Sequence, residues 1–109
     1  MRPIPFRLLI HSATLRHLTG TDEFQHPTCI DTELSRIRID PSTRTLKTKD
    51  NTARTYNAVC FFDCTRSRPR GAVFYLGDRL VFDGTEYEIG SIERLYDGRR
   101  LHHYEIGLM

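Results

Sequence analysis

The chain has 109 residues, of which 39% are hydrophobic and 28% are charged, a composition typical of one small folded domain and too apolar for a disordered chain. No apolar run approaches the roughly 20 residues that a membrane-spanning helix needs, and we expect no signal peptide. The formal net charge of +2 conceals a basic middle, because residues 36–70 carry nine Lys or Arg against three acids, whereas residues 71–109 carry four Arg against seven acids. This asymmetry indicates contact with nucleic acid or self-complementary assembly.

Apolar residues recur mostly with a period of two, which predicts strands and little helix. The first strand is expected over residues 4–11, where apolar residues of one parity form a single face. The next stretch, LRHLTGTDEFQHPT, predicts a loop or an irregular hairpin. The best candidate for a helix in the chain is a short turn near residues 14–24. A second strand is expected over residues 29–40, with a bulge or break where the apolar parity changes between Leu34 and Ile37.

Residues 40–55 are polar and hold Leu46 as their one large apolar residue. They predict a long surface loop or a loosely held β-hairpin, and a loop of this length in a small domain is more often functional than decorative. The stretch that follows, TYNAVCFFD, is apolar on both faces, which is typical of a fully buried strand. A second basic loop, CTRSRPRG, comes next. The basic side chains are Arg44, Lys47, Lys49 and Arg54 in the first segment and Arg66, Arg68 and Arg70 in the second.

The stretch GDRLVFDGTEYEIG predicts a β-hairpin with Asp83 and Gly84 as a two-residue type I′ turn. Pairing outward from that turn places Leu80 opposite Tyr87, so that the large apolar residues share the buried face. Because the turn and the apolar pattern agree on one register, we expect this hairpin to form with that register.

The last stretch, SIERLYDGRRLHHYEIGL, repeats this pattern around Asp97 and Gly98. A three-residue loop that ends at Arg99 keeps the apolar residues on common faces better than a two-residue turn does. This register places Glu93 opposite His103. Asp83, Gly84, Glu93, Asp97, Gly98 and His103 are therefore expected to have structural roles.

Together these stretches predict an all-β domain, a small β-barrel or sandwich of about six to seven mostly antiparallel strands with long loops. We expect one domain over residues 1–109, with the long polar loop at about residues 40–55. The three cysteines, Cys29, Cys60 and Cys64, are odd in number, and we expect no export signal. We expect them to be buried thiols in a reducing cytoplasm.

The adjacent His102 and His103 raise the question of a metal site or an acid–base pair. Neighbouring strand residues point to opposite faces, so these two side chains cannot easily bind one metal ion, and zinc needs three or four converging ligands. The chain also lacks the phosphate-binding, dinucleotide-binding, nucleophile-elbow and zinc-protease motifs. We therefore expect no catalysis, no metal and no cofactor.

The two basic segments remain as the candidate functional sites. Lys and Arg contacts to DNA phosphates would give salt-dependent, sequence-independent affinity, and the same side chains suit an acidic partner ring. No recognition helix or zinc finger is evident, so sequence-specific readout of DNA is not expected.

The strings AVCFFDCTRSRP and FYLGDRLVFDGTEYEIGSIERLYDGRRLHHYEIGLM form a succession of strand end, Ser–Pro loop, hairpin and closing strand. In this succession, over residues 56–109, the chain resembles a family of small tailed-phage and prophage minor capsid proteins, which are similar to the head-completion or head–tail connector proteins of long-tailed phages. The first half matches this family in length, strand content and its polar central segment. The Arg-rich composition and the positions of Cys60 and Cys64 are particular to this chain.

The resemblance implies a structural protein of the phage neck, assembled in the bacterial host cytoplasm as a hexameric or dodecameric ring. Such rings contact the portal or adaptor complex on one side and tail proteins on the other, and they involve no membrane. In stopper-type members a loop projects into the channel and retains packaged DNA, and residues 40–55 are the candidate loop. The second basic loop is then a candidate for contact with another ring or with DNA.

Other functions stay open at this point. Within the phage family the chain could be an adaptor, a tail terminator or a decoration protein. Outside it, the chain could be a small nucleic-acid-binding barrel that acts alone through its basic segments. A small hydrolase or metal enzyme would require bound zinc, which we do not expect.

Overall fold

The computed structural model describes residues 2–47 and 53–109. In these residues it has six strands and one short 3-10 helix. They are η1 (Phe6–Leu8), β1 (His11–Thr21), β2 (Pro27–Lys47), β3 (Ala53–Asp63), β4 (Arg79–Phe82), β5 (Thr85–Asp97) and β6 (Arg100–Leu108). The prediction of an all-β domain is confirmed.

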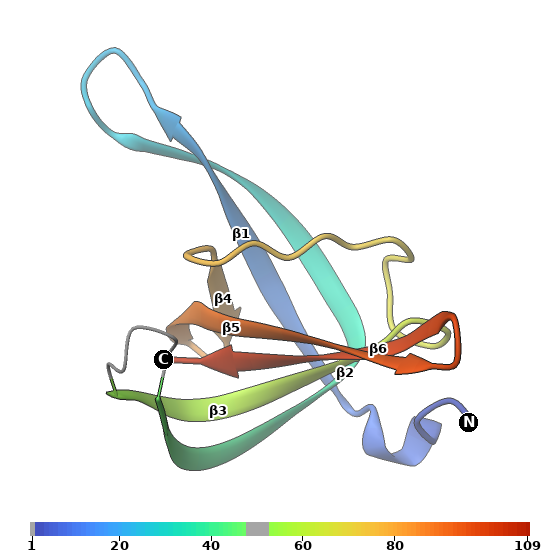
Figure 1. The fold of residues 1–109 in the computed structure, drawn as a ribbon. Coiled ribbons are helices and arrows are strands. Elements are labelled where there is room, and N and C mark those ends of the chain that lie inside the picture. The colour runs from blue at the N-terminus through green and yellow to red at the C-terminus, as the bar shows by residue number, and fades with distance from the viewer. Residues whose placement is uncertain (1, 48–52) are drawn as a thin grey trace.

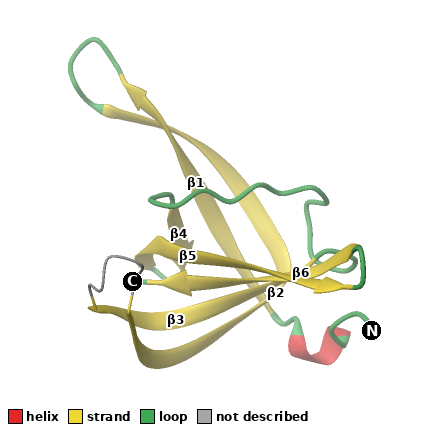
Figure 2. Cartoon of the chain, in the orientation of Figure 1, coloured by secondary structure: helices red, strands yellow, loops and turns green. Residues whose placement is uncertain are grey.

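The strands form a closed antiparallel barrel in the order β1-β2-β3-β6-β5-β4, with β4 returning to pair with β1 (Figure 1). Closure gives hydrogen-bond partners to the backbone N–H and C=O groups that an open sheet would leave unpaired at its edges. Strands β3 and β4 are not neighbours, so residues 64–78 must pass across the barrel to connect them. This segment, called the crossover below, runs mostly as irregular chain (Figure 2).

The strand β2 is 21 residues long, and its two parts pair with different neighbours. Its first part pairs with β1 and its second part with β3. The ladder with β1 shifts register at a bulge between Leu34 and Ile37, just before the pairing with β3 begins. Arg36 lies at this bulge with a φ of 54°, which confirms the predicted irregularity between Leu34 and Ile37. The bulge bends the strand, so one sheet can serve both the barrel and an extension from it.

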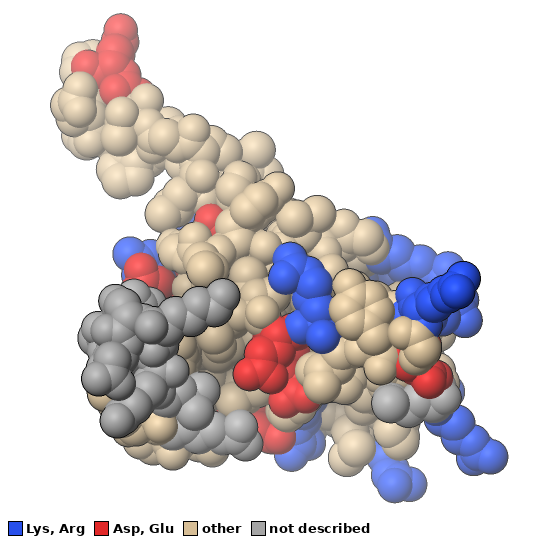
Figure 3. All heavy atoms as spheres, viewed as in Figure 1, with Lys and Arg blue, Asp and Glu red and all other residues tan. Residues whose placement is uncertain are grey.

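That extension is a two-stranded ribbon that projects from the barrel (Figures 1 and 3). It comprises residues 17–31, with the tip at residues 22–26, and is called the ribbon below. The prediction of a helical turn near residues 14–24 was wrong, because residues 14–21 pair with β2 as a strand, with one register shift between Leu18 and Gly20. The hairpin alternative is confirmed.

The predicted first strand over residues 4–11 was also wrong. Residues Phe6–Leu8 form a 3-10 turn, and the apolar parity of Phe6, Leu8 and Ile10 faces solvent. Pro5 precedes this turn and Pro3 lies two residues earlier, and neither can donate to a strand ladder. Leu9, the residue off that parity, is the one that becomes buried.

The expected long loop over residues 40–55 is instead mostly strand. Asp40 lies opposite Val59 and Lys47 opposite Ala53, with a bulge between them, so the alternative of a β-hairpin is confirmed for the described residues. The connection between the two strands falls in residues 48–52, which lie outside the described part of the chain.

The two C-terminal hairpins differ in how well the sequence predicts them. In the β4–β5 hairpin, Leu80 lies opposite Tyr87 as expected, and Asp83 and Gly84 have positive φ angles of 50° and 77°, as a type I′ turn requires. In the β5–β6 hairpin the expected register was wrong. Glu93 lies opposite Glu105, because the turn is tighter than predicted.

The tighter turn pairs Asp97 with Arg100, and the ladder then slips once. Leu95 lies opposite His103 while Tyr96 lies opposite Leu101, so His102 is the extra residue of a bulge. The other side of β6 determines this register, since it pairs with β3 over six residues and buries Ile106 completely.

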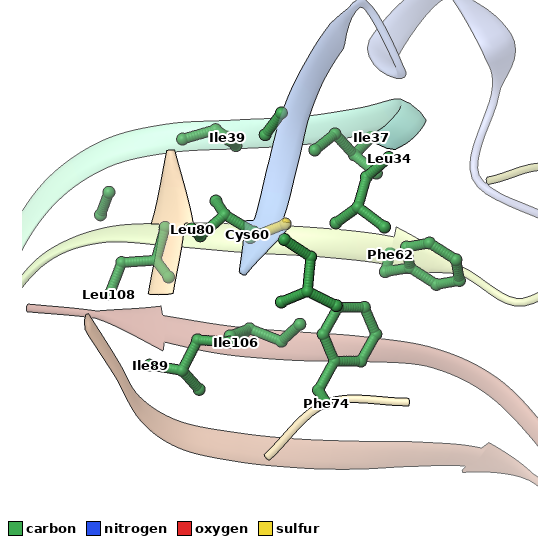
Figure 4. Packing of buried hydrophobic residues seen from close by; sticks show 13 residues of the cluster. Leu34, Ile37, Ile39, Cys60, Phe62, Phe74, Leu80, Ile89, Ile106 and Leu108 are labelled. Atoms are coloured by element: carbon green, nitrogen blue, oxygen red, sulfur yellow. The ribbon is translucent and has the colours of Figure 1, made fainter. Parts of the chain in front are cut away.

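The core of the barrel consists of side chains from all six strands and from the crossover (Figure 4). The aromatic ring of Phe74 in the crossover packs edge-on against Phe62 and Tyr104, with both pairs of ring centroids 5.3 Å apart. Burial of each such large side chain contributes about 1.5–3 kcal/mol to folding. The largest buried apolar residues are Leu34, Ile37, Ile39, Phe62, Leu80, Ile89, Ile106 and Leu108.

Candidate functional surfaces

A buried carboxylate organises the end of the barrel where β3 finishes. Asp63 is fully buried, and its Oδ1 accepts hydrogen bonds from the backbone N–H groups of Thr65 and Arg66 at 2.8 and 2.9 Å. Its Oδ2 accepts the N–H of Ile4 at 2.8 Å. One side chain thus fixes both the turn after β3 and the N-terminal segment.

Ser67 extends this network to β2. Its Oγ accepts the N–H of Asp63 at 2.9 Å and donates to the carbonyl oxygen of Arg36 at 2.5 Å. The backbones of Ser35 and Arg68 also exchange two hydrogen bonds. Sequence reasoning treated Asp63 and Ser67 only as parts of a family string, although an Asp followed two to four residues later by backbone donors and a Ser is a recognisable turn signal.

The structure gives different environments to the three arginines of the second basic loop. The guanidinium of Arg66 lies 4.2 Å from the centroid of the Phe6 ring and donates to the carbonyl oxygen of Ile4 at 3.2 Å. Arg68 donates to the carbonyl oxygens of its own loop at 2.8 and 3.0 Å. Arg70 is exposed and has no hydrogen bond or ion pair among the described residues. Arg70 is therefore the arginine of this loop best placed to meet another molecule.

The first basic segment lies at the opposite end of β3. Arg44 and Lys47 are in β2 and Arg54 is in β3, on a hairpin that continues beyond the last residue paired with β6. Lys49 lies outside the described residues, as do the side chains of the other three. Since β3 has 11 residues at about 3.3 Å each, the two basic segments are about 35 Å apart. The structure does not bring them together.

Charge is separated along the molecule (Figure 3). The tip of the ribbon carries Asp22 and Glu23, whereas exposed arginines gather at the other end, near the N-terminus and the turn between β5 and β6. Arg99 and Arg100 of that turn are both exposed. Opposite charges at opposite ends favour head-to-tail contact between copies over contact between like ends.

The two histidines contact each other, contrary to the expectation that they face apart. Because His102 is the bulge residue, its Nδ1 lies 2.7 Å from Nδ1 of His103, and its Nε2 lies 2.6 Å from the carbonyl oxygen of Arg2. His103 Nε2 lies 3.1 Å from Glu105, not beside Glu93 as predicted. These contacts tie the bulge of β6 to the N-terminal segment and to Glu105.

No group of three or more metal-ligating side chains occurs within residues 2–47 and 53–109. The cysteines there are all free: Cys60 is buried, Cys64 is half-buried and Cys29 is exposed on β2. The expectation of buried thiols is confirmed for Cys60 and wrong for Cys29. Burial raises the pKa of the Cys60 thiol to about 12, which leaves it unreactive at neutral pH.

A second buried carboxylate ties the ribbon to the crossover. Asp78 accepts hydrogen bonds from the N–H of Leu18 at 3.3 Å, and its Oδ2 lies 2.8 Å from Nδ1 of His17. The His17 ring also packs on Tyr75, with centroids 4.7 Å apart. The base of the ribbon is therefore held in a fixed direction relative to the barrel.

Within the described ranges, no helix has the length and hydropathy needed to cross a membrane. In a comparison with known families, the model of a minor capsid protein family aligns with residues 5–108. The match extends the resemblance from the C-terminal half to almost the whole chain. A search of curated proteins found no match.

Proposed function

Since the chain belongs to the phage minor capsid protein family and is a structural protein of the virion, we propose that it acts in the neck as a stopper-type head-completion subunit. In this role it joins the portal or adaptor complex to the tail and helps to retain packaged DNA. It assembles in the bacterial host cytoplasm and has no catalytic activity, metal or cofactor.

One observation carries the retention of DNA: the basic hairpin that extends beyond β6. Strand β6 pairs with β3 only as far as Ala58, so the β2–β3 hairpin continues as two strands alone. Arg44 and Lys47 of β2 and Arg54 of β3 fall in that extension. Lys49 lies outside the described residues, and residues 42–57 hold Asp50 as their one acid in sequence. A basic hairpin at one end of a rigid barrel suits non-specific contact with DNA phosphates.

The segregation of charge supports assembly as a ring. A head-to-tail contact repeats from copy to copy, and it closes when the rotation between neighbours divides a full turn. The proposed ring is a hexamer or a dodecamer, with the basic hairpins directed toward the channel. Arg68, which is exposed at the other end of β3, is then a candidate for contact with a second ring or with DNA.

The test is charge reversal at Arg44, Lys47, Lys49 and Arg54, all to Glu, in the complete phage. We expect heads that lose DNA or fail to join tails, measured as nuclease-protected DNA per particle and by electron microscopy. The matched control exchanges Lys and Arg at the same four positions, which keeps the charge and should leave particles normal. Normal DNA content and infectivity in the charge-reversed phage would rule out the retention role.

A small nucleic-acid-binding barrel is the second candidate, and the same basic hairpin favours it. In that case the purified monomer should bind duplex DNA with an affinity that falls steeply as salt rises, because bound phosphates release counterions. The neck role predicts weak binding by the monomer and ring formation on portal complexes. The alternative family roles of adaptor, tail terminator and decoration protein would be distinguished by where the protein lies in imaged particles.

A further inference from the structure

The tip of the ribbon is a pre-formed structure with an exposed aromatic ring. Asp22 Oδ1 accepts the backbone N–H groups of Phe24 and His26 at 2.8 and 2.9 Å, so the turn is fixed from within. Phe24 is 70% exposed, although it is the largest side chain of the tip. Glu23 is exposed beside it and makes no hydrogen bond or ion pair among the described residues. A rigid turn that presents a phenyl ring and a carboxylate loses little entropy on binding.

A groove of about 330 Å³ lies where the ribbon leaves the barrel. His17 and Ile30 of the ribbon and Leu15 of β1 form one wall, and the crossover forms the other. Ile30, Val73 and Tyr75 are exposed by 60%, 57% and 51%, which is unusual for large apolar residues that line one concave surface. The only charged side chain of its lining is Arg70.

The tip and the groove are complementary in chemistry. The groove offers apolar walls with one arginine at the rim, and the tip offers a phenyl ring next to one carboxylate. Within one molecule they cannot meet, because the tip lies about 15 to 20 Å farther along the ribbon than Leu15 and His17. Asp78 and the paired strands also hold the ribbon away from the groove.

We propose that the ribbon tip of one copy docks in the groove of a second copy, with Phe24 between Ile30 and Val73 and Glu23 beside Arg70. The contact is heterologous, since each copy uses its tip on one neighbour and its groove on the other. This inference rests on the proposed ring, for which it names the contact between subunits. Phe24 then becomes the central buried anchor, and the Glu23–Arg70 pair determines which surface is chosen.

The first test is disulfide trapping in assembled particles. Glu23→Cys and Arg70→Cys are combined with Cys29→Ser and Cys64→Ser, which leaves the buried Cys60 as the one native thiol. The particles are oxidised and separated without reductant. We expect a ladder of cross-linked multimers, because these positions are too far apart within one copy for a disulfide bond. Each variant that carries only one of the two introduced cysteines is the control and should give no ladder.

The second test is a charge exchange in the phage. Arg70→Glu and Glu23→Arg should each lower the yield of tailed particles by about tenfold or more, and the double variant should recover most of that loss. Glu33→Arg combined with Arg70→Glu is the matched control and should not recover, because Glu33 lies in the barrel part of β2, opposite Thr14 and away from the tip. All variants should keep the wild-type circular dichroism spectrum.

The outcomes separate this contact from the proposed function. If neck rings are imaged but no ladder forms and the double variant does not recover, the tip–groove contact is wrong while the neck role stands. If no ring is found in the neck at all, the proposed function fails. A ladder together with recovery in the double variant supports both.

Discussion

In the barrel the large apolar side chains that point inward are buried almost completely, whereas in the ribbon Phe24 and Ile30 are 70% and 60% exposed. Both regions are antiparallel β-structure, and β1 and β2 run through both, so backbone pairing does not explain the difference. The ribbon has two strands and no third layer, and nothing within residues 2–47 and 53–109 covers its apolar residues. Its stability comes from the ladder and from exposed pairs such as Arg16–Asp31, which contribute little.

Polar groups show the same contrast. Asp63 in the barrel and Asp22 in the ribbon each accept two backbone N–H groups of the turn that follows. Asp63 is fully buried, while the side chain of Asp22 is 38% exposed. The same local motif is therefore part of the folding core in one region and a shaping device for a surface in the other. Matched pairs of residues can test this division directly.

The largest difference between the two regions is expected in the chemical reactivity of their thiols. Burial raises the pKa of Cys60 from near 9 to about 12, so at a given pH its thiolate is about a thousandfold less populated. Cys29 in the ribbon is exposed. At pH 8 iodoacetamide should modify Cys29 first and leave Cys60 unmodified until the protein unfolds, as peptide mass spectrometry would show.

Cys64 should react at an intermediate rate, because burial and then the negative charge of Asp63 raise its pKa. Cys29→Ser is the control and should remove the fast reaction alone. Modification of Cys60 at the rate of Cys29 in the folded protein would mean that the barrel opens far more easily than its packing implies.

The next largest effect is expected in the free energy of unfolding, which should fall by different amounts when Asp63 and Asp22 are each replaced by alanine. Asp63→Ala leaves three backbone N–H groups without their acceptor in a buried site, so we expect the free energy of unfolding to fall by about 3 kcal/mol. Asp22→Ala removes an equivalent turn in water, which can replace the lost acceptor, and should cost less than about 1 kcal/mol. Urea unfolding followed by circular dichroism measures both. Equal losses would show that the ribbon and the barrel fold as one unit of the same stability.

The structural features that sequence patterns predicted most reliably are those that neighbouring residues in the chain determine. The Asp83–Gly84 turn fixes its own register because two positive φ angles and a short alternating pattern agree. The β5–β6 register was wrong because it depends on β3, about 40 residues earlier, and on a bulge at His102 that no local pattern marks. The proline-rich start was mistaken for a strand because its apolar alternation was weighed above its missing donors.

The candidate surfaces were harder to predict than the fold. A count of charges in the second basic loop cannot tell that Arg66 is held on Phe6, since that contact joins residues 60 positions apart. Asp63, Ser67 and Asp78 are polar residues of loops by sequence, and only the folded chain buries them. The groove combines the ribbon with the crossover, which the sequence separates by about 40 residues, so no motif could indicate it.

The smallest effect is expected from removing one methylene group from an isoleucine in each region. Ile39 is 2% exposed in the barrel, so Ile39→Val should lower the free energy of unfolding by about 1 kcal/mol through lost contacts and a small cavity. Ile30→Val in the ribbon should change it by less than about 0.5 kcal/mol, since that side chain already lies in water. Urea unfolding of the purified chain resolves this difference. A loss at Ile30 as large as the loss at Ile39 would mean that the ribbon is covered in the isolated chain, and its apolar residues would then serve folding instead of contact with another copy.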